Sequence, residues 1–536
     1  MNITISKLYK WNHLSDESIQ CWYIGSERVI QFILLYLEEH PHVQAADLKK
    51  AFSCLYGNFA FIIQQESRII AAVDRIRSYP VFYTYDGSRF QVSNSARTLK
   101  EENRLDEIDS LSILEFRMAG YVTGSGTVLS KVRQLKAGEM LLWDGKSNRI
   151  DLARHFCFLP DKVGQETFQD DDDRIDALKQ HTDQIFERVV ENAAGRPIWV
   201  PLSGGLDSRL VLCMLARKQY DNLHAFSYGV PRNHEARIAR IVAGKIGVPW
   251  TFVPIGRRAF RRFYRSAQRR DYWAYCDFLS SVPNMQDLLP LREMLADGTL
   301  SGNAVMVNGQ SGDFITGGHI PDLLPEKDKN WECIFEALVE KHFSQWSESL
   351  THGNLKRIEE KLLNLLSEVS PDPKESEDKF ALYEYWEWQE RQCKYVVNGQ
   401  RVYDWLGLDW ELPLWDSEYL DFWRNVPSDA KKGQRIYLDF LMRWNPYGLF
   451  KQFQATVWRW PGPMIAVVPL ARIAGLLAGI RMKNFLYRMA TFWGHYGYYY
   501  AAVGMYRFLR HSKTARGGVS YFIDDWLREN FPAVTV

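Results

Sequence analysis

The chain has 536 residues, of which 46% are hydrophobic and 24% charged, so it is long enough for about two to four domains with buried cores. Its formal net charge of +1 gives no reason to expect a nucleic-acid partner. The seven cysteines are scattered and form no CxxC pair, which argues against a structural zinc site.

The first residues, Met1 to Thr4, lack a basic region followed by an apolar core, so a secretory signal is not expected. An odd number of cysteines without such a signal fits a reducing compartment. Together these features predict a cytoplasmic protein.

Residues 1–160 contain short β-prone runs separated by turn signals. Asp86-Gly87 lies between two of these runs and predicts a hairpin with a type I′ turn, in which both central residues have positive φ. A later pair of strands is expected around 121–123 and 139–143. This part of the chain is therefore predicted to be an antiparallel, β-rich domain with flanking helices. Its other predicted strands are 59–63, 69–73, 81–85 and 90–93.

The composition turns polar at 164–173, and the four consecutive acids from Asp170 to Asp173 indicate a solvated linker or the start of a helix. From there on, helical patterns alternate with short apolar strands. This alternation predicts an α/β architecture with a doubly wound parallel sheet, followed beyond about residue 259 by a mostly helical part. The expected strands are 198–202, 223–227 and 250–254, and the expected helices are 176–194, 209–218 and 235–246.

A glycine loop, Ser203-Gly204-Gly205-Leu206-Asp207-Ser208, directly follows the first of these strands. Glycines let backbone N–H groups converge on an anion, and the N-terminus of the next helix adds a favourable dipole. Ser203 and Ser208 add hydroxyl donors. A phosphate would repel Asp207, so its carboxylate indicates a bridging Mg²⁺. The spacing is neither that of a Walker loop nor GxGxxG.

This loop resembles that of the PP-loop ATP pyrophosphatases, and neighbouring segments narrow the resemblance to the asparagine synthetase family. Ala225-Phe226-Ser227-Tyr228-Gly229 is similar to the family's second strand, which receives the adenine and ribose. Asn308-Gly309-Gln310-Ser311-Gly312-Asp313, followed by Gly317-Gly318, is similar to the family's SGEGxDE…GG segment. The resemblance implies ATP and Mg²⁺ as cofactors, with Asp207 and Asp313 as the metal carboxylates. The residues it implies for nucleotide binding are Leu202, Ser203, Gly204, Gly205, Leu206, Asp207, Ser208, Ser227 and Gly309.

A third segment resembles the part of the family that carries a catalytic lysine. Glu411-Leu412-Pro413-Leu414-Trp415-Asp416 is similar to the family's RxPFLD, and Lys431 to Leu438 follows it. Arg435 falls on the register of the family lysine and Lys432 lies close to it, so either cation is a candidate for stabilising the pyrophosphate leaving group. The alternative is that both are ordinary solvated charges at a helix start. Gln310 replaces the family's glutamate and is a candidate for orienting a substrate, because an amide is a poor proton acceptor.

The N-terminal half resembles the family's glutamine amidotransferase domain, which is of the N-terminal-nucleophile (Ntn) type. Members that hydrolyse glutamine use a cysteine at position two, where this chain has Asn2. We therefore expect no glutaminase activity, and the nitrogen would come as free ammonia, from a separate protein, or from an amine substrate. The segments that carry this resemblance are 57–61, 74–75, 80–83 and 93–95.

The end of the chain, 446–536, is predicted to be a helical tail rich in aromatic and basic residues. Residues 460–480 are apolar apart from Arg472 but contain three prolines, and basic residues surround them. One interpretation is a peripheral contact of 460–510 with a membrane surface, in which Lys and Arg side chains meet anionic headgroups. The other is a pair of buried helices.

The predicted fold is thus α/β, with an Ntn-type β-rich domain at 1–160, a PP-loop domain at 175–445 and a helical tail. The resemblance implies that a substrate carboxylate is adenylated with release of pyrophosphate, and that ammonia or an amine then forms an amide. Asparagine and the amide of a sugar acid are both open as products. A non-catalytic ATP-binding scaffold is the alternative function, and a homodimer is one of the open oligomeric states.

Overall fold

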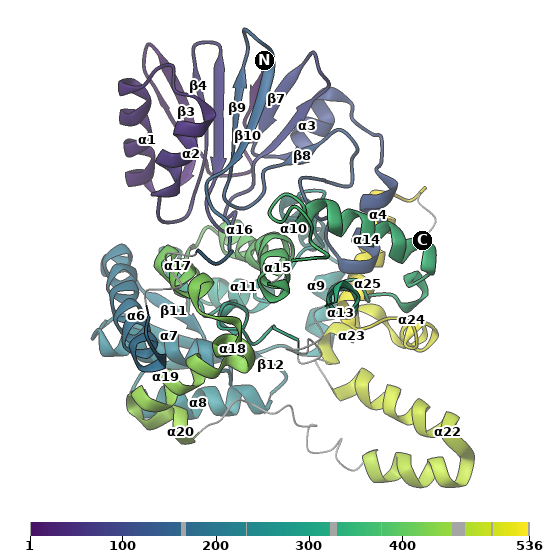
Figure 1. Ribbon diagram of the computed structural model, residues 1–536. Coiled ribbons are helices and arrows are strands. Elements are labelled where there is room, and N and C mark those ends of the chain that lie inside the picture. Colours follow the sequence, from purple (N-terminus) through teal and green to yellow (C-terminus); the bar gives the residue numbers. More distant parts are fainter. Residues whose placement is uncertain are drawn as a thin grey trace.

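Figure 1 shows the computed structural model of the protein, which describes residues 2–161, 168–231, 233–321, 330–376, 378–452, 467–494 and 497–533. A β-rich part formed by the N-terminal residues lies at the top of that view, and an α/β part with many helices lies below it. The helix α22 (Val467–Gly494) extends away from the body at the lower right.

Two sheets build the N-terminal part. The larger is antiparallel, with strand order β10-β9-β5-β4-β3-β2, and the smaller has the order β1-β7-β6-β8. The strands are β1 (Ile3–Thr4), β2 (Asn12–Ser15), β3 (Ile19–Gly25), β4 (Phe59–Gln65), β5 (Arg68–Val73), β6 (Phe82–Tyr85), β7 (Phe90–Ser93), β8 (Arg133–Gln134), β9 (Glu139–Asp144) and β10 (Arg149–Arg154). The accompanying helices are α1 (Glu27–Glu39), α2 (Ala45–Ser53), α3 (Ala96–Asn103) and α4 (Ser110–Ala119).

The larger sheet is buried on both faces. Along β4, Phe59, Phe61 and Ile63 pack with side chains of α1 and α2, because successive side chains of a strand point to opposite faces. Ala60 and Ile62 belong to the core between the two sheets. The strands predicted at 59–63, 69–73, 81–85 and 90–93 are confirmed.

The strand expected at 121–123 is absent, and that prediction was wrong. Gly120 and Gly124, which flank it, have φ values of 89° and 65°, a conformation that does not continue a strand. Tyr121 makes only an isolated bridge, and β9 pairs with β5 and β10 instead.

The hairpin between β6 and β7 is also not closed by the expected type I′ turn. Gly87 has a φ of 91°, but Asp86 does not share the positive φ that such a turn requires. Instead, the Asp86 carboxylate accepts hydrogen bonds from the backbone N–H groups of Ser88 and Arg89, at 2.9 and 2.8 Å. These side-chain bonds add to a long backbone hydrogen bond, in which the N–H group of Asp86 donates to the carbonyl oxygen of Arg89 at 3.4 Å.

A five-stranded parallel sheet forms the centre of the lower part, with strand order β13-β12-β11-β14-β15. Its strands are β11 (Ile198–Pro201), β12 (Leu223–Gly229), β13 (Trp250–Pro254), β14 (Val305–Val307) and β15 (Asp409–Glu411). The connecting helices include α7 (Leu206–Arg217) and α8 (His234–Ile246), close to the predicted bounds. The predicted α/β class, an antiparallel β-rich part followed by a doubly wound parallel sheet, is confirmed.

The four acids at 170–173 begin the long helix α6 (Asp171–Ala193). The side chain of Asp170 accepts a hydrogen bond from the N–H group of Asp173 at 2.9 Å and caps the helix. The other acids lie in the first turn, where the positive end of the helix dipole favours negative charge. The polar run is therefore a helix start, and its preceding residues 162–167 lie outside the described part of the chain.

Helices complete the α/β part. Helix α15 continues directly as the π-helix η2, a rare form that recurs at functional sites. The elements are α9 (Arg257–Tyr264), α10 (Ala267–Cys276), α11 (Leu288–Ala296), α12 (Gly312–Ile315), α13 (Trp331–His342), α14 (His352–Leu366), α15 (Lys379–Trp386), η2 (Glu387–Val396), η3 (Val397–Gln400), α16 (Arg401–Leu406), η4 (Pro413–Trp415), α17 (Ser417–Asn425), α18 (Ser428–Lys431), η5 (Lys432–Gln434), α19 (Arg435–Trp444) and α20 (Leu449–Gln452).

The C-terminal residues return to the body of the protein. Helix α23 (Gly497–Val503) packs against α9, and α25 (Gly518–Asn530) packs against α4 of the N-terminal half. Of the stretch 460–510, residues 460–466 and 495–496 lie outside the described residues. Within the described part of the chain, the helices are all too short or too polar to cross a membrane.

Replacement of Trp526 by Ala is expected to lower the free energy of unfolding by about 3–5 kcal/mol, because a large buried ring is lost. Trp526 is fully buried, stacks on Phe116 with ring centroids 4.2 Å apart, and donates from Nε1 to Asp277 at 2.9 Å. Urea denaturation measures the change, with the exposed Leu476→Ala as the control. Equal denaturation midpoints for both variants would show that α25 is not part of the cooperative core.

Candidate functional site

The glycine loop and the second glycine-containing segment meet at the carboxyl edge of the parallel sheet. The first, Ser203–Gly205, follows β11, and the second, Asn308–Ser311, follows β14. The chain proceeds from β11 to β12 and β13 on one side and returns to place β14 on the other side. The crevice between β11 and β14 is therefore the switch point at which open parallel sheets bind ligands.

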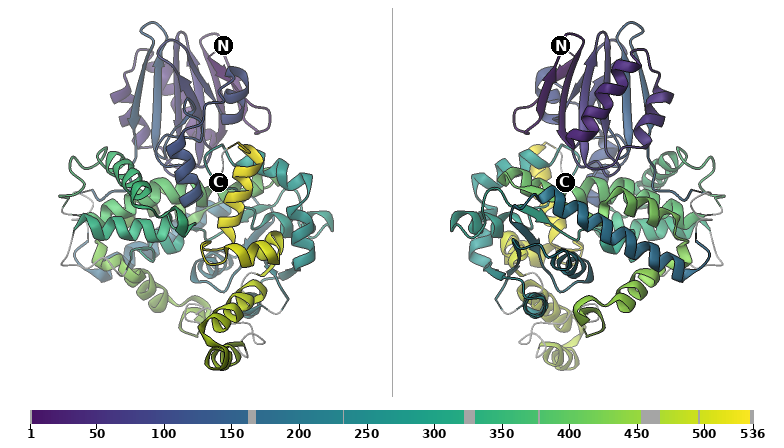
Figure 2. Two further views of the ribbon diagram at one scale, coloured as in Figure 1. Left: turned by 90° about the vertical axis from the view of Figure 1, so that its right-hand side faces the viewer. Right: turned by 90° about the vertical axis from the view of Figure 1, so that its left-hand side faces the viewer.

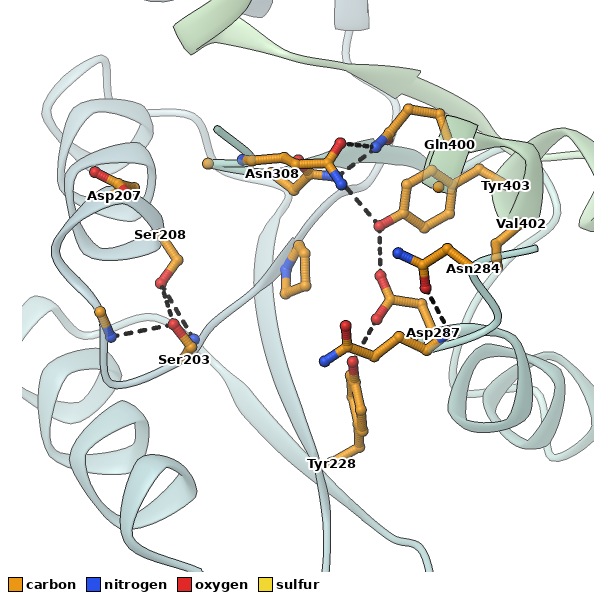
Figure 3. Close-up of a pocket in the computed structure, with 16 residues that line it drawn as sticks. Ser203, Asp207, Ser208, Tyr228, Asn284, Asp287, Asn308, Gln400, Val402 and Tyr403 are labelled. Carbon is orange, nitrogen blue, oxygen red and sulfur yellow. Dashed lines mark hydrogen bonds between the residues drawn. The ribbon is translucent and has the colours of Figure 1, made fainter. Parts of the chain in front are cut away.

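The first loop is held in shape by its own hydroxyl groups, as Figure 3 shows. The Oγ atoms of Ser203 and Ser208 are 3.1 Å apart, and the N–H group of Gly205 donates to Ser203 Oγ at 3.1 Å. Helix α7 begins directly afterwards with no side-chain cap, so the first N–H groups of the helix are available to an anion. Beneath the loop, the buried Arg209 donates to the carbonyl oxygen of Gly204 at 2.9 Å.

Glycines allow the second loop to lie directly against the first. A Cβ atom at Gly309 would lie 2.7 Å from the carbonyl carbon of Asp207 and 2.8 Å from the backbone nitrogen of Ser208. A Cβ atom at Gly312 would lie 2.5 Å from Cγ of Asp207. A larger residue at position 309 would have to move the backbone of the first loop, and one at position 312 would have to displace the side chains of Asp207 and Leu414, so the sequence of the second loop sets the width of the crevice.

This close approach brings the two predicted metal carboxylates together. Asp207 is half-buried and accepts a hydrogen bond from the hydroxyl of Tyr437 at 2.8 Å. Asp313 is exposed and contacts Nε2 of His319 at 2.9 Å, while Nδ1 of His319 lies 2.5 Å from the buried Glu387. Burial, together with the charge of Asp313, raises the pKa of Asp207 to about 7. Both effects disfavour the charged form of Asp207, and a cation bound beside it would favour that form.

The two carboxylates fit a cation that is bound together with phosphates. In the described part of the chain, no group of three or more His, Cys, Asp or Glu side chains is arranged to hold a metal ion. Mg²⁺ usually takes one or two protein carboxylates and completes its shell with water and substrate phosphates. Asp207 and Asp313 therefore suit a nucleotide-bound Mg²⁺ rather than a metal held by protein alone.

A cavity of about 240 Å³ opens between the first loop and helices of the lower part. Of the predicted site residues, six line it. Its lining residues are Pro201, Ser203, Gly205, Asp207, Ser208, Tyr228, Asn284, Gln286, Asp287, Asn308, Gly309, Gln310, Gly399, Gln400, Val402 and Tyr403. The wall that faces the loop is thus made mainly of amide and phenol side chains.

Asp287 is the centre of that opposite wall (Figure 3). The hydroxyls of Tyr228 and Tyr403 donate to its two carboxylate oxygens at 2.5 and 2.7 Å, and Asn308 donates to the Tyr403 hydroxyl at 3.2 Å. Burial raises the pKa of Asp287, and the two tyrosine hydrogen bonds act in the opposite direction. The network connects β12, the second loop and α16, so it fixes the shape of the cavity.

Gln310 is oriented by a neighbouring amide. Nε2 of Gln400 donates to Oε1 of Gln310 at 2.5 Å, and Oε1 of Gln400 accepts from Nδ2 of Asn308 at 3.1 Å. The backbone N–H group of Gln310 donates to Asn308 at 3.0 Å. Gln310 lines the cavity, and because its oxygen is engaged, its Nε2 group is the part of the amide that remains to act as a donor.

Several predicted nucleotide-binding residues support the site from below. Leu202, Gly204 and Leu206 are buried under the loop. Ser227 is buried in the sheet, where it donates to the carbonyl oxygen of Leu202 at 2.6 Å and accepts from Trp250 at 3.0 Å. Ser227 does not line the cavity, because the strand alternation turns the next residue, Tyr228, toward it, and the role of Ser227 in nucleotide binding stays a prediction.

The two predicted catalytic cations do not line the cavity. Arg435 is half-exposed and forms an ion pair with Asp171 of α6 at 2.5 Å, so its guanidinium is occupied at the surface. Lys432 is partly buried in η5. From this segment it is Tyr437, at the first turn of α19, that reaches Asp207. The neighbouring Lys431 is buried and pairs with Glu384 at 2.6 Å.

Sequence reasoning missed most of the wall opposite the loop. Tyr228 and Asn308 lie inside segments that resemble the family. The alternation of side chains along the strand would have identified Tyr228 as a residue that faces the cavity. Asn284, Gln286 and Asp287 precede α11, and Gln400 and Tyr403 lie at η3 and α16, where the sequence has no recognisable motif.

A β-rich part with an antiparallel sheet is followed in this chain by a parallel sheet that carries a glycine loop at its carboxyl edge. Residues 181–441 match the asparagine synthase family, and residues 45–155 match the glutamine amidotransferase domain. Together these matches take in most of the chain, and the protein belongs to the asparagine synthetase family. No curated protein matches the chain.

Two solved structures are similar over part of the chain. One is glutamine phosphoribosylpyrophosphate amidotransferase from B. subtilis in complex with ADP and GMP, with 15% identity, a TM-score of 0.18, and coverage of 57% of this chain and 59% of that one. The other is described as the allosteric regulatory enzyme of purine biosynthesis, with 14% identity, a TM-score of 0.18, and coverage of 56% of both chains. The present chain thus spans somewhat over half the length of these proteins.

Replacement of Gly309 by Ala is expected to weaken nucleotide binding by at least about tenfold, because the added methyl group meets the backbone of Asp207 and Ser208 and pushes the two loops apart. Equilibrium binding of ATP in the presence of Mg²⁺ measures the effect. Gly302→Ala is the matched control, since a Cβ atom there meets no atom within 4 Å. Equal affinities of the two variants would contradict the assigned contact between the loops.

The raised pKa of Asp207 predicts a pH-dependent stability of the nucleotide-free protein. Because its pKa is about 7 in the folded state and lower in the unfolded chain, stability attributable to this group falls as pH rises from about 4 to about 7. Asp207→Asn removes this effect, so the variant is expected to be more stable than wild type by about 2–4 kcal/mol near pH 8 and equal to it near pH 4.

Denaturation measured at both pH values without nucleotide or divalent cation tests this expectation. Asp176→Asn, at an exposed position of α6, provides the control and should show no such difference. A stability gain for Asp207→Asn that is the same at both pH values would refute the assignment of the shift to Asp207.

Proposed function

We propose that the protein is an ATP-dependent carbon–nitrogen ligase that adenylates a carboxylate and passes the acyl group to ammonia or an amine. The observation that carries this proposal is the meeting of Asp207 and Asp313 beside an uncapped helix N-terminus and a polar cavity. Such a site binds a pyrophosphate group with its cation on one side and leaves room for an acid on the other.

The residues divide into those that bind ATP and those that bind the substrate. The N–H groups at the start of α7 and the hydroxyls of Ser203 and Ser208 bind the pyrophosphate. Asp207 and Asp313 hold Mg²⁺, which neutralises charge on the phosphates when it is bound. Lys432 and Arg435 remain the candidate cations for the leaving group, and Arg435 would have to leave Asp171 to reach it.

The cavity wall opposite the loop suits a carboxylate and an amine. Nε2 of Gln310 is positioned to donate to a substrate carboxylate, which orients one of its oxygens toward the α-phosphorus. Attack by that oxygen breaks the bond to pyrophosphate and gives an acyl-adenylate. Attack of the amine nitrogen on the acyl carbon then forms the amide and releases AMP and a proton. Asp287, the carboxylate of this wall, favours the approach of a cationic amine or ammonium group.

We further propose that the nitrogen does not come from glutamine hydrolysed by the N-terminal part. Position two is Asn2, whose backbone oxygen accepts from the N–H group of Val92 at 2.8 Å. The nearest cysteine, Cys21, is fully buried in β3, and burial raises the pKa of its thiol to about 12. A thiol in that state is a poor nucleophile. Free ammonia, a separate ammonia-supplying protein or an amine substrate is the proposed source.

The second candidate function is a scaffold that binds ATP without ligation. Phe314 favours it, because the position after Asp313, acidic in the family, is here a buried ring packed near Phe158 and Trp415. Gln310 also favours the scaffold, because an amide cannot act as a base. The polar cavity beside the loop, which leaves room for a second substrate, favours the ligase.

Acid-dependent exchange of pyrophosphate into ATP tests the proposal. With Mg-ATP and a panel of carboxylates that includes aspartate and sugar acids, the wild type is expected to catalyse exchange with at least one acid. Asp207→Asn should reduce the rate by about 100-fold or more, because a group that stabilises the phosphate charge is lost. Asp176→Asn serves as the control. ATP binding without exchange for any acid would support the scaffold. Full activity of Asp207→Asn would contradict the assignment of Asp207 to the ATP site.

A further inference from the structure

The C-terminal part of the chain carries an unusual distribution of charge. Between Asp439 and Asp524 the sequence has eleven Lys and Arg residues and no Asp or Glu. Since the whole chain carries +1, the remaining residues together carry −10. The net charge of the protein therefore conceals one strongly cationic segment, and α22 lies within it.

Helix α22 stands away from the body and exposes apolar side chains. Figures 1 and 2 show it as two helical arms below the α/β part. The arms meet at Gly479, whose φ of 81° and ψ of 172° interrupt the helix. On the first arm, Leu470, Ile473 and Leu477 recur at the three- and four-residue spacing of one helix face. Leu476 and Leu477 beside the bend are 87% and 84% exposed.

The base of α22 packs against the body of the protein. Phe492, near the end of the second arm, is buried and packs against Phe508 with ring centroids 5.0 Å apart. Arg257 of α9 donates to the carbonyl oxygen of Phe492 at 2.9 Å and covers its ring. The second arm also exposes Met482 and Phe485 near the tip. The apolar tip is thus presented at a fixed place on the molecule.

Basic side chains flank the apolar tip. Arg472 on the first arm and Lys483 on the second form no ion pair with the described residues, and neither do the exposed Arg510 and Lys513 near α24 (Met505–His511). The exposed Tyr506 lies on α24, which contacts α22. Exposed leucines on a helix that carries unpaired cations, beside a second helix with exposed basic and aromatic residues, are typical of elements that lie in the headgroup region of a bilayer.

We propose that α22 docks the protein on the surface of an anionic phospholipid membrane, with the tip from Leu470 to Phe485 inserted among the acyl chains. The lack of acids over the whole segment gives it charge complementarity to anionic headgroups and none to a second copy of the same cationic surface. These leucines remain exposed to water in the folded chain, and insertion into the membrane would bury them. This docking is independent of the ligase reaction proposed above.

Co-sedimentation of the full chain with vesicles tests the docking. Vesicles of phosphatidylcholine with about one third phosphatidylglycerol should bind the protein at least about tenfold more tightly than pure phosphatidylcholine, and about 0.5 M NaCl should weaken the binding. Leu476→Asp combined with Leu477→Asp should reduce binding at least about tenfold, since charges at the tip oppose insertion. The matched control is Leu8→Asp with Leu35→Asp, two leucines exposed elsewhere.

A second pair of variants tests the charge. Arg472→Gln with Lys483→Gln should weaken binding to anionic vesicles and reduce its salt dependence, whereas Lys49→Gln with Lys50→Gln on α2 should not. Circular dichroism verifies the fold of each variant.

Hydrogen exchange should slow at 470–485 when vesicles are added. The proposal is overturned if wild type and the tip variant sediment equally, or if the tip variant instead dissociates a dimer that does not bind vesicles.

Discussion

The contact between two loops at the edge of the parallel sheet determines the site. Gly309 and Gly312 lie so close to Asp207 that their missing side chains are a requirement of the structure. This contact places one carboxylate from each loop at the head of α7 and raises the pKa of Asp207. The sheet order, with β14 beside β11, brings the loops to the same edge, and the glycines then set their separation.

The π-helix η2 connects this contact to the N-terminal half. On one side, Gln392 accepts a hydrogen bond from Ser311 of the second loop at 2.8 Å. On another, Glu390 accepts from the N–H group of Gly124 at 2.8 Å, and Lys394 donates to carbonyl oxygens of the same segment. The β-rich part is therefore joined to the second loop through one irregular helix. The N-terminal half thus contacts the same helix that holds Ser311 in place.

The sequence was informative where the chemistry is local. The loop Ser203–Ser208 could be recognised because an anion site at a helix start needs small residues and hydroxyls that are adjacent in the chain. The parallel sheet followed from the alternation of helices and apolar strands. The opposite wall could not be predicted in the same way, since Asp287 and Tyr403 come together only through the packing of α11 and α16. Ser227 and Arg435 lie outside the cavity lining, and in each case a nearby tyrosine, Tyr228 or Tyr437, contacts a carboxylate of the site.

The bend at Gly479 decides what kind of element α22 is. A straight helix of its 28 residues would be about 42 Å long, which exceeds the hydrocarbon thickness of a bilayer. Divided at Gly479, each arm is about 18–22 Å long, and the chain reverses direction before either arm reaches that thickness. Glycine at this position thus converts a segment of transmembrane length into a shallow wedge, and any residue that restored a continuous helix would change the depth to which the element can reach.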